Sequence, residues 1–547
     1  MARILSVPNA LGRYQRYHPT LEMSWREEIE EIERRRELAK LHGGEQAVAK
    51  QHGRGRLTIR ERIDGLIDAH SFQEEGTHAG FPEYDDNDNM IGFAPANYIL
   101  GIGRIEGRQC VVGGEDFTQR GGSPNPAGLR KSVFAEELAC RLRVPLIRFL
   151  EGGGGSVRGA AKGKRPTVSG EPVYSVPRFA SIARVLRTAP VVSAAMGATA
   201  GLPAARLAAS HMALMTRETS QVLIGGPALV ERALGEKKTK EELGGPDVHA
   251  RSGVVDRVAD DEDHVFELVR TFLGYLPSRV GEVAPRAPTR TDDPPTRAAQ
   301  ELLEIIPRDR RRLYDMRRVI GLIVDTDTFF ELNPLYGRSQ ITGLARLDGH
   351  TVGVFANDPN HLGGAMGAEG AQKARRFINL CQTFHLPIVS LVDEPGFMIG
   401  SASEQAGTIR YGVEAIQATV ESTVPWVSVH VRKAYGVAAA AHFGPQGRTL
   451  AWPSAESGAL PLEGGVAVAF RREIAAADNP DARRRELEET MAKGRTPFPR
   501  AESYSVNDLI DPRDTRLELC RWVELAQPLV EAEARRRGAR LDRSIDW

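Results

Sequence analysis

A short phrase occurs twice in this chain, and no other sequence feature restricts the possible folds as strongly. "PVVSAAMGATAG" at residues 190–201 and "PWVSVHVRKAYG" at residues 425–436 both begin with proline, continue through a Val-Ser pair and an apolar run, and end on glycine. "GIGRIEG" (101–107) matches "GLARLDG" (343–349), which begins 242 residues further on. Matches that recur in one order at a nearly constant offset predict an internal duplication.

Further matches define the extent of the two repeated units. "VPLIRFLEGGG" (144–154) and "LPIVSLVDEPG" (386–396) are again 242 residues apart, whereas "DAHSFQE" (68–74) and "DTDTFFE" (325–331) are 257 apart. The polar stretch "PEYDDNDNMIGFAPA" lies between these matches in the first unit only, and its length accounts for the larger offset. We therefore interpret it as an insertion in the first unit.

The units and their flanking composition predict four segments. These are a helical extension at residues 1–49, a first domain at 50–285, a linker at 286–305 and a second domain at 306–547. The linker region includes "APRAPTRTDDPPTRAAQ", which is rich in proline and charge, as linkers are. The N-terminal "SWREEIEEIERRRELAK" has acid–base pairs four residues apart and predicts an exposed or partner-docking helix.

Inside each unit short apolar runs alternate with helical patterns. "TVGVFAND" is typical of a strand, "GAEGAQKARRFINLCQTFH" spaces its apolar residues three and four apart like a helix, and "LPIVSLVD" is again typical of a buried strand. Strands that alternate with helices favour an α/β fold with largely parallel strands.

Composition excludes several classes of function. Lys plus Arg and Asp plus Glu both number 72, so no bulk charge favours nucleic acid or an anionic membrane. The four cysteines are far apart without a CxxC pair, and the thirteen histidines form no HExxH, so neither a disulfide framework nor a metal centre is indicated. We find no GxSxG motif, signal peptide or membrane span, and we expect a cytoplasmic protein.

The glycine that ends each repeated phrase stands where a strand is expected to give way to a helix. The first N–H groups of a helix have no internal partner, and glycine allows a ligand oxygen to approach them closely. Two adjacent N–H groups that converge on one point form an oxyanion hole without any catalytic side chain. The alternative is that each glycine only lets the strand and helix pack closely. Its presence in both units favours two facing oxyanion sites and a reaction with two enolate-like partners.

Six segments carry a resemblance to a known family. They are "RGRLTIRERIDGLID", "EELGGPDVH", "DEPGFMIGSASEQAGTIRYG", "VRKAYG", "AWPSAE" and "LIDPRDTR". Together, in collinear order over roughly residues 25–530, they resemble the carboxyltransferase (β) subunits of biotin-dependent acyl-CoA carboxylases, such as propionyl-CoA and methylcrotonoyl-CoA carboxylases. The resemblance implies two tandem crotonase-like (ClpP/crotonase) ββα-spiral domains, in agreement with the duplication.

The resemblance also implies the reaction and the partners. In this family CO2 passes from carboxybiotin to the α- or γ-carbon of an acyl-CoA. The N-half binds acyl-CoA and the C-half binds biotin, and the active site lies between the N-half of one subunit and the C-half of another. It implies a homohexamer and no metal in this chain. No Met-Lys dipeptide occurs, so we expect biotin to arrive on a biotin carboxylase or biotin carboxyl carrier subunit.

The family's oxyanion holes map onto the two glycine phrases. The acyl-CoA hole maps to Gly201 and Leu202 and the biotin hole to Gly436 and Val437. The family usually has glycine at both second positions, so Leu202 and Val437 narrow the space above a retained N–H. The segment "SGALPLEGG" and the loop "EGGGGSVRGAAKGKRP" also depart from the family pattern. These departures leave the acyl-chain specificity open.

Two loops supply the remaining binding candidates. The glycine run Gly153, Gly154 and Gly155 follows an expected strand and can bring amides near the acyl group or pantetheine. The cations that follow it are candidates for the CoA phosphates, with a solvated surface loop as the alternative: Arg158, Lys162, Lys164 and Arg165.

In the second unit, Pro395, Gly396 and Phe397 belong to a D-x-P-G-F turn that leads to the biotin pocket in this family. Phe397 either contacts the cofactor ring or is core. Tyr435 directly precedes the C-half hole, and packing is its expected role. Glu456, after "AWPSA", is either a catalytic carboxylate or a satisfied buried one.

Three functions remain open at this stage. The first is a carboxyltransferase subunit of an acyl-CoA carboxylase. The second is a decarboxylase subunit that acts on a carboxyacyl-CoA such as glutaconyl-CoA by the same chemistry in reverse. The third is a non-catalytic scaffold homologue, whose altered holes no longer support turnover.

Overall fold

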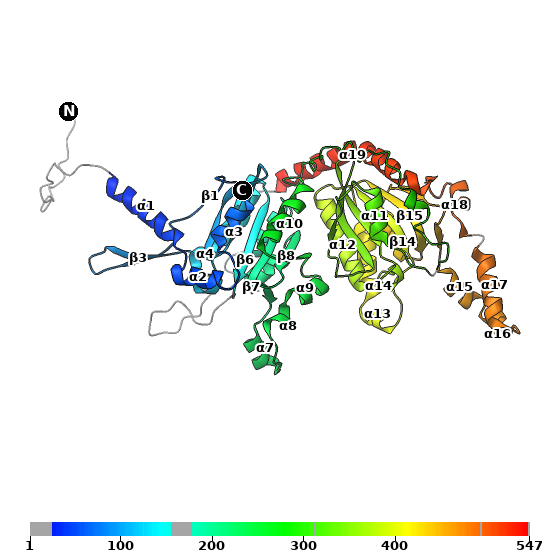
Figure 1. The fold of residues 1–547 in the computed structure, drawn as a ribbon, viewed down its shortest axis with the longest axis horizontal. Coiled ribbons are helices and arrows are strands. Elements are labelled where there is room, and N and C mark those ends of the chain that lie inside the picture. The colour runs from blue at the N-terminus through cyan, green and yellow to red at the C-terminus, as the bar shows by residue number, and fades with distance from the viewer. Residues whose placement is uncertain (1–24, 124, 155–177, 311, 493–494, 545–547) are drawn as a thin grey trace, which may run out of the picture.

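Two similar α/β halves lie next to each other along the long axis of the molecule (Figure 1). The computed structural model describes residues 25–123, 125–154, 178–310, 312–492 and 495–544. Each half is built around one eight-stranded sheet.

The strand order is the same in both sheets. In the first half it is β1 (Gln73–Glu74), β4 (Tyr98–Ile105), β5 (Arg108–Glu115), β6 (Leu146–Gly152), β7 (Val191–Ala200), β8 (Met212–Thr216) and β10 (Arg257–Ala259), with β9 (Gln221–Leu223) paired to β7. In the second half it is β11 (Phe330–Leu332), β12 (Gln340–Leu347), β13 (His350–Asn357), β14 (Ile388–Glu394), β15 (Trp426–Tyr435), β16 (Arg448–Ala451) and β18 (Asp508–Leu509), with β17 (Glu456–Gly458) paired to β15. This one-to-one match confirms the predicted duplication.

The pairing registers also repeat. β4 and β5 form an antiparallel hairpin, as β12 and β13 do, and the strands that follow are parallel. Val111 pairs with Leu146 in the first half, and Gly353 pairs with Ile388 at the equivalent positions of the second. The predicted α/β fold with largely parallel strands is therefore confirmed.

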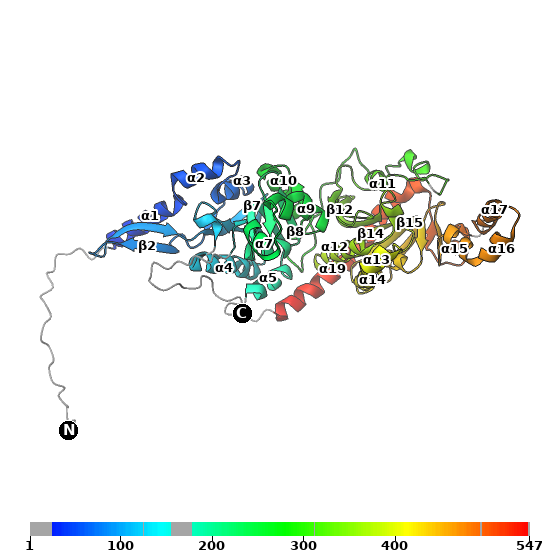
Figure 2. The same ribbon diagram turned by 90° about the horizontal axis from the view of Figure 1, so that it is seen from below.

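Helices cover both faces of each sheet (Figure 2). In the first half α3 (Ile59–Leu66) and α10 (Glu262–Gly274) lie on one face, and α4 (Pro126–Leu142) and α5 (Arg178–Leu186) on the other. In the second half α11 (Met316–Ile323) and α19 (Thr515–Ser544) pack on one face, and α12 (Ala368–Thr383) and α14 (Thr408–Val420) on the other. Amphipathic helices of this kind bury their apolar stripe against the sheet.

The two halves share one hydrophobic cluster, because α10 packs against β11. The rings of Phe272 and Phe330 lie 6.4 Å apart, and the Tyr275 hydroxyl donates to the Thr328 carbonyl at 2.5 Å. α19 extends from the second half across to the first (Figure 1). There its backbone approaches so closely that a Cβ added at Gly538 would lie 3.2 Å from the Gly281 Cα.

The predicted insertion is a β-hairpin of β2 (Gly80–Tyr84) and β3 (Met90–Pro95), and the predicted N-terminal helix is α1 (Arg26–Lys40). The other helices are α2 (Glu45–His52), α6 (Leu202–Ala208), α7 (Pro227–Leu234), α8 (Lys240–Gly244), α9 (Pro246–Ser252), α13 (Ser401–Gln405), α15 (Leu462–Ala469), α16 (Arg471–Ala476), α17 (Pro480–Ala492) and α18 (Phe498–Glu502). Short 3-10 turns are η1 (Arg120–Gly122), η2 (Gln300–Leu303), η3 (Leu362–Gly364), η4 (Ala438–His442) and η6 (Pro512–Asp514).

Candidate active site

The first repeated phrase folds as predicted into a strand, a glycine and a helix. β7 ends at Ala200, Gly201 has φ +68° and ψ −129°, and α6 begins at Leu202. This backbone conformation is open to glycine and strained for residues with a side chain. The N–H groups of Gly201 and Leu202 donate to no acceptor within the part of the chain that the structure describes. Pro203 has no N–H, so these two groups are the donors at this junction.

The second repeated phrase has the same form but one donor fewer. β15 ends at Tyr435, Gly436 has φ +62°, and the following turn, η4, is a 3-10 helix with Val437 as its N-cap. The Gly436 N–H donates to the Gly458 carbonyl at 3.1 Å, which extends the pairing of β15 with β17. This corrects the expectation that Gly436 offers its own N–H to a ligand. The first N–H beyond that bond is that of Val437, whose residue is 63% exposed.

A loop glycine packs against each junction. A Cβ added at Gly154, after β6, would lie 2.9 Å from the Ala200 carbonyl oxygen. A Cβ added at Gly396, after β14, would lie 3.9 Å from the Tyr435 carbonyl oxygen. Both glycines have positive φ, +74° and +126°. The same contact is therefore built twice, at equivalent positions of the two halves.

The turn after β14 is held by the Glu394 side chain, by backbone pairing and by the Phe397 ring. The Gly396 N–H donates to the Glu394 carboxylate at 3.0 Å, and Phe397 forms an isolated bridge with Met366. The Phe397 ring packs on α14 so closely that a Cβ at Gly412 would lie 2.3 Å from it. Phe397 is half-buried against the core cluster, so its ring has a packing role in the protein itself.

Two further predicted residues lie on the paired strands β15 and β17 next to the second junction. Tyr435 is 1% exposed, with the Arg495 guanidinium 5.6 Å from its ring centroid, and burial raises the pKa of its phenol. The Glu456 carboxylate is buried and ion-paired with Arg310. Glu456 is therefore a satisfied carboxylate, whereas Tyr435 is packed and its hydroxyl has no hydrogen-bond partner among the described residues.

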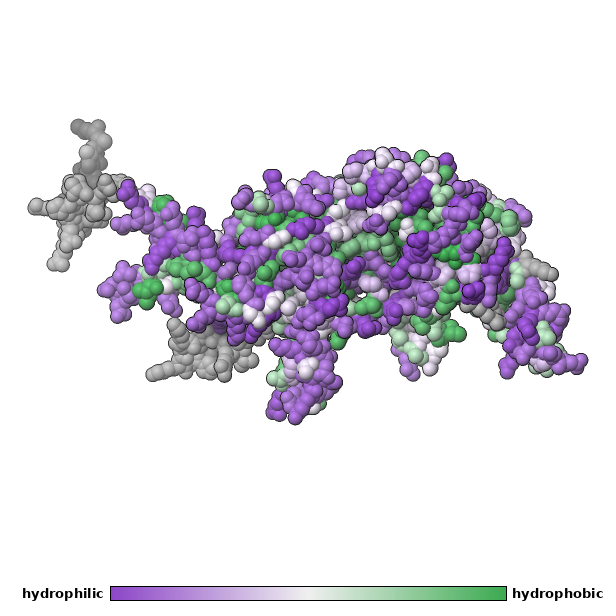
Figure 3. All heavy atoms as spheres, viewed as in Figure 1, coloured by the Kyte–Doolittle hydropathy of each residue, from purple (hydrophilic) through white to green (hydrophobic). Residues whose placement is uncertain are grey.

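A largely apolar cavity of 610 Å³ lies beside the turn of the second half. It extends from the segment after η3 to α13, and Met398 and Ile399 of the turn line it. Leu362 and Ile399 are 61% and 81% exposed at its rim. Apolar residues also gather on the surface over α13 (Figure 3). The cavity thus offers an apolar wall along the turn whose Gly396 approaches the second junction.

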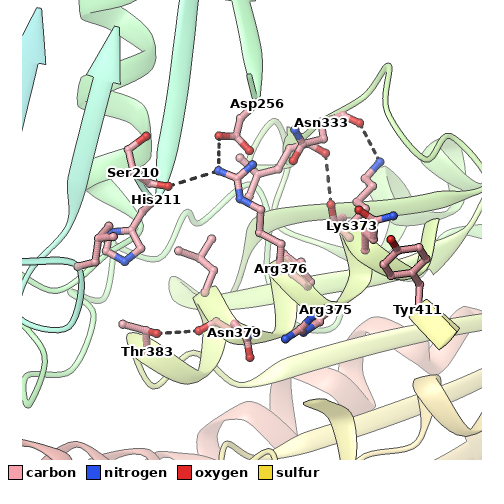
Figure 4. A pocket seen from close by; sticks show the side chains of 16 residues that line it. Ser210, His211, Asp256, Asn333, Lys373, Arg375, Arg376, Asn379, Thr383 and Tyr411 are labelled. Carbon is pink, nitrogen blue, oxygen red and sulfur yellow. Dashed lines mark hydrogen bonds and ion pairs between the residues drawn. The ribbon is translucent and has the colours of Figure 1, made fainter. Parts of the chain in front are cut away.

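A second cavity, of 520 Å³, lies between the halves and contains none of the predicted residues (Figure 4). Arg376 of α12 crosses it to form a 2.9 Å ion pair with Asp256 of the first half. The Lys373 ammonium, 3% exposed, donates to the carbonyls of Asn333 and Gln340 at 2.9 and 2.7 Å. Burial lowers the pKa of Lys373 to about 8. The ion pair of Arg376 thus joins the two halves, whereas the hydrogen bonds of Lys373 lie within the second half.

Part of the predicted CoA-binding loop lies outside the described residues: Gly155, Arg158, Lys162, Lys164 and Arg165. Its beginning is described, and the Gly153 N–H donates to the Gly121 carbonyl at 3.1 Å. The basic cluster stays a prediction.

The sequence did not predict a network of buried charged side chains inside the first half. Glu151, 0% exposed, accepts from Arg56 and Arg62 at 2.5 and 2.6 Å, and Arg62 also pairs with Glu262 at 2.8 Å. These partners are about 90 to 200 positions apart in the chain, so no spacing motif connects them. One signal was available for the buried lysines, because Lys131 and Lys373 are also 242 residues apart.

Within the described ranges, no group of three or more His, Cys, Asp or Glu side chains is arranged to hold a metal ion. Over the same ranges, no helix has both the length and the apolar character needed to cross a bilayer.

The repeated sheets and glycine junctions define the class of protein, a pair of tandem crotonase-like domains. The profile of the carboxyl transferase domain matches residues 50–540. The propionyl-CoA carboxylase carboxyltransferase subunit of Haloferax mediterranei is 35% identical over 91% of this chain and 95% of its own. The methylmalonyl-CoA decarboxylase subunit alpha of Veillonella parvula is 32% identical over 90% and 94%. The chain belongs to the carboxyl transferase domain family.

A solved structure extends the comparison to the whole fold. The transcarboxylase 12S hexamer with methylmalonyl-coenzyme A and methylmalonic acid bound has a TM-score of 0.82 and 32% identity, and the match covers 94% of this chain and 97% of that one. The predicted recognition and the predicted tandem fold are therefore confirmed.

Proposed function

We propose that this carboxyltransferase moves CO2 from carboxybiotin on a partner subunit to an acyl-CoA, as the carboxyltransferase subunit of an acyl-CoA carboxylase. The observation that carries the proposal is the junction of strand, glycine and helix with a loop glycine against it, present once in each half. Two such junctions suit a reaction in which negative charge develops on two different oxygens.

In the first half the acyl-CoA thioester carbonyl would lie against the N–H groups of Gly201 and Leu202. These donors stabilise the enolate oxygen that forms when the α-proton leaves. Because the strand and the positive φ of Gly201 fix their direction, little reorganisation is needed during the reaction. The loss of one such donor costs on the order of 2.7–4 kcal/mol in known enzymes.

In the second half the residues present fit biotin. Gly396 has no side chain to fill the space between the turn and the end of β15, and the adjoining cavity is lined by Met398 and Ile399. Those residues would hold the apolar bicycle, with the Val437 N–H directed at its ureido oxygen. When bound, the carboxylated group supplies the CO2 that is transferred. Phe397, packed on α14, would support this wall from behind.

We further infer that the complete site needs two copies of the chain. Leu202 lines a small cavity made only of first-half residues, whereas Ile399 lines one made only of second-half residues. Within the described chain, neither of these two cavities contains a residue of the other half. The related 12S transcarboxylase is a hexamer, and a hexamer of this chain would pair the first half of one copy with the second half of the next.

A decarboxylase subunit is the second candidate, because one close relative is named as such. It would use both junctions in the reverse direction. The two functions differ in their need for ATP, which only the carboxylase consumes through its biotin carboxylase partner.

The test is a panel of acyl-CoAs, from acetyl to branched and long chains, incubated with the chain and its biotinylated partner. A carboxylase gives ATP hydrolysis that depends on one or a few of them. A decarboxylase releases CO2 from a carboxyacyl-CoA without ATP. Partner binding with neither activity would mean that the chain is a scaffold and that the proposal is wrong.

A further inference from the structure

A fully buried carboxylate lies directly below the second junction. Glu394 is the last residue of β14 and occupies the position that the D-x-P-G-F pattern leaves open. Its Oε1 accepts the Gly396 N–H at 3.0 Å, and its Oε2 accepts the amides of Asn357 and Gln340 at 2.9 and 3.3 Å. The residue is 0% exposed. A buried carboxylate is costly unless such donors and a countercharge surround it.

His442 packs against the same carboxylate. It is the last residue of η4, the turn that begins beside Val437, and it is 0% exposed. Its Nε2 lies 3.5 Å from the Glu394 Oε2, and its Nδ1 lies 3.0 Å from the Ser390 hydroxyl. The ring is stacked on Phe355, with centroids 4.2 Å apart and planes 6° from parallel.

His442 packs against the carboxylate without a hydrogen bond to it. Its Nε2, 3.5 Å from the Glu394 Oε2, has no hydrogen-bond partner among the described residues. The ring is held by the contact of its Nδ1 with the Ser390 hydroxyl and by its stacking on Phe355. His442 is thus fixed in direct contact with the carboxylate on the side of η4.

The same carboxylate connects three segments around the second junction. The amides of Asn357 and Gln340 also donate to the Gly364 carbonyl, each at 3.2 Å, which ties in η3. The Gly396 N–H ties in the turn, and His442 ties in η4. The His442 carbonyl in turn accepts from the indole of Trp426 and the hydroxyl of Ser428, so η4 is anchored at its end.

The first half has no such pair at the equivalent positions. Gly152 stands at the position of Glu394, and Leu207 at that of His442. A Cβ at Gly152 would lie 2.8 Å from the Gly122 carbonyl oxygen. In the first half, backbone atoms therefore occupy the space that the Glu394 side chain fills in the second. The pair therefore distinguishes the second half from the first at these positions.

We propose that Glu394 and His442 act as a positioning pair that fixes the turn and η4 relative to each other, and so sets the affinity of the second half for biotin. This inference rests on the proposed function. It predicts that the pair affects the biotin side of the reaction and leaves the acyl-CoA side unchanged. It also predicts that the two residues act as one unit, because each works through the other.

The experiment measures carboxyl transfer from methylmalonyl-CoA to biocytin by the full-length chain, with kcat and KM determined for both substrates. The variants are Glu394→Gln, His442→Gln and the double variant. The control is His385→Gln, which changes a buried histidine (1% exposed) that accepts the Gly281 N–H far from the turn. Thermal unfolding checks that each variant is folded. If His442→Gln does not fold, His442→Phe, which keeps the stacking on Phe355, replaces it.

We expect either single variant to raise the KM for biocytin about tenfold and to change the KM for methylmalonyl-CoA less than twofold. The double variant should be no worse than a single one, since neighbours in one network are not additive. Equal losses for both substrates, a double variant equal to the product of the singles, or the same loss in His385→Gln would overturn the inference. A wild-type chain inactive with every acyl-CoA would instead refute the proposed function, and the inference with it.

Discussion

The two halves of this protein share one backbone and differ in the side chains that hold it. The N–H of Glu151 in the first half and that of Asp393 in the second are equivalent, yet the first donates to the Glu115 carboxylate at 3.4 Å and the second to the Asn357 amide oxygen at 3.0 Å. Next to these bonds the first half buries Glu151 in ion pairs with two arginines. The second half instead buries Glu394 among side-chain amides and His442. Duplication preserved the junctions, and the networks beneath them diverged. This is expected if the two junctions bind different ligands.

The largest expected effect tests the first junction. Gly201→Val places a β-branched residue at φ +68° and ψ −129°, a conformation it cannot adopt without strain, and so misdirects the N–H groups of residues 201 and 202. We expect transfer to acyl-CoA to fall at least about 10³-fold, while CO2 release from carboxybiotin stays measurable. Steady-state rates of both half-reactions check this.

Gly235→Val is the matched control for Gly201→Val. Gly235 has φ +74° with nothing near an added Cβ, at the end of α7. Its substitution should strain the backbone similarly and leave both rates near those of the wild type. Equal loss of the two half-reactions in Gly201→Val would contradict the division of labour between the halves.

The next effect sharpens the comparison at the second junction. Val437→Pro removes the one N–H that replaces the donor lost at Gly436, and the φ of −70° suits proline. We expect the biotin half-reaction to fall about 10²–10³-fold, as for the loss of one oxyanion donor. Val437→Ala keeps the N–H and should lose much less. Similar losses in the two variants would mean that the side chain, rather than the amide, is the functional group.

A smaller effect compares two equivalent lysines. Burial lowers the pKa of both Lys131 and Lys373 to about 8, from an ordinary 10.5. Between these pH values the unfolded chain binds more protons than the folded one, so the stability of the wild type rises with pH. The gain is at most about 1.4 kcal/mol per pH unit for each lysine.

Lys373→Met and Lys131→Met each remove one titrating lysine and so should lose its share of this gain. The difference in melting temperature, wild type minus variant, should therefore increase between pH 8 and pH 10. Lys237→Met, an exposed lysine, is the control. A difference for Lys373 alone would show that the two positions are not equivalent in burial.

The smallest effect concerns the contact between the halves. Arg376→Gln removes the ion pair to Asp256, whose carboxylate is 3% exposed and also accepts the Ala213 N–H at 2.7 Å. We expect a loss of about 0.5–1 kcal/mol in the free energy of unfolding, because Arg376 is 39% exposed. Arg375→Gln removes a pair with Glu414 inside the second half, both partners being at the surface, and should have no measurable effect. Equal losses of stability in the two variants would mean that the ion pair between Arg376 and Asp256 does not stabilise the contact between the halves.

Much of the fold was predictable from residue order. The offsets of 242 and 257 predicted an insertion in the first unit, and this segment folds as the hairpin of β2 and β3. They also made β4 the equivalent of β12, because aligned repeats must fold alike. The bond from the Gly436 N–H to Gly458 was not predictable, since β17 lies in a segment that departs from the family pattern and its register is set by tertiary packing. The same holds for Glu394 and His442, which are 48 positions apart and meet only because η4 folds back over β14.

The sequence alone determined that there are two units, that each ends a buried strand on a glycine, and that the chain belongs among the carboxyltransferases. It did so because periodicity and glycine placement are local properties of the chain. The tertiary structure alone decided which N–H groups remain free at each junction and which buried charges support them. The free N–H groups and the buried charges depend on strand register and on contacts between segments that are distant in the sequence. One added backbone bond, such as that of the Gly436 N–H, turns a free donor into a bonded one.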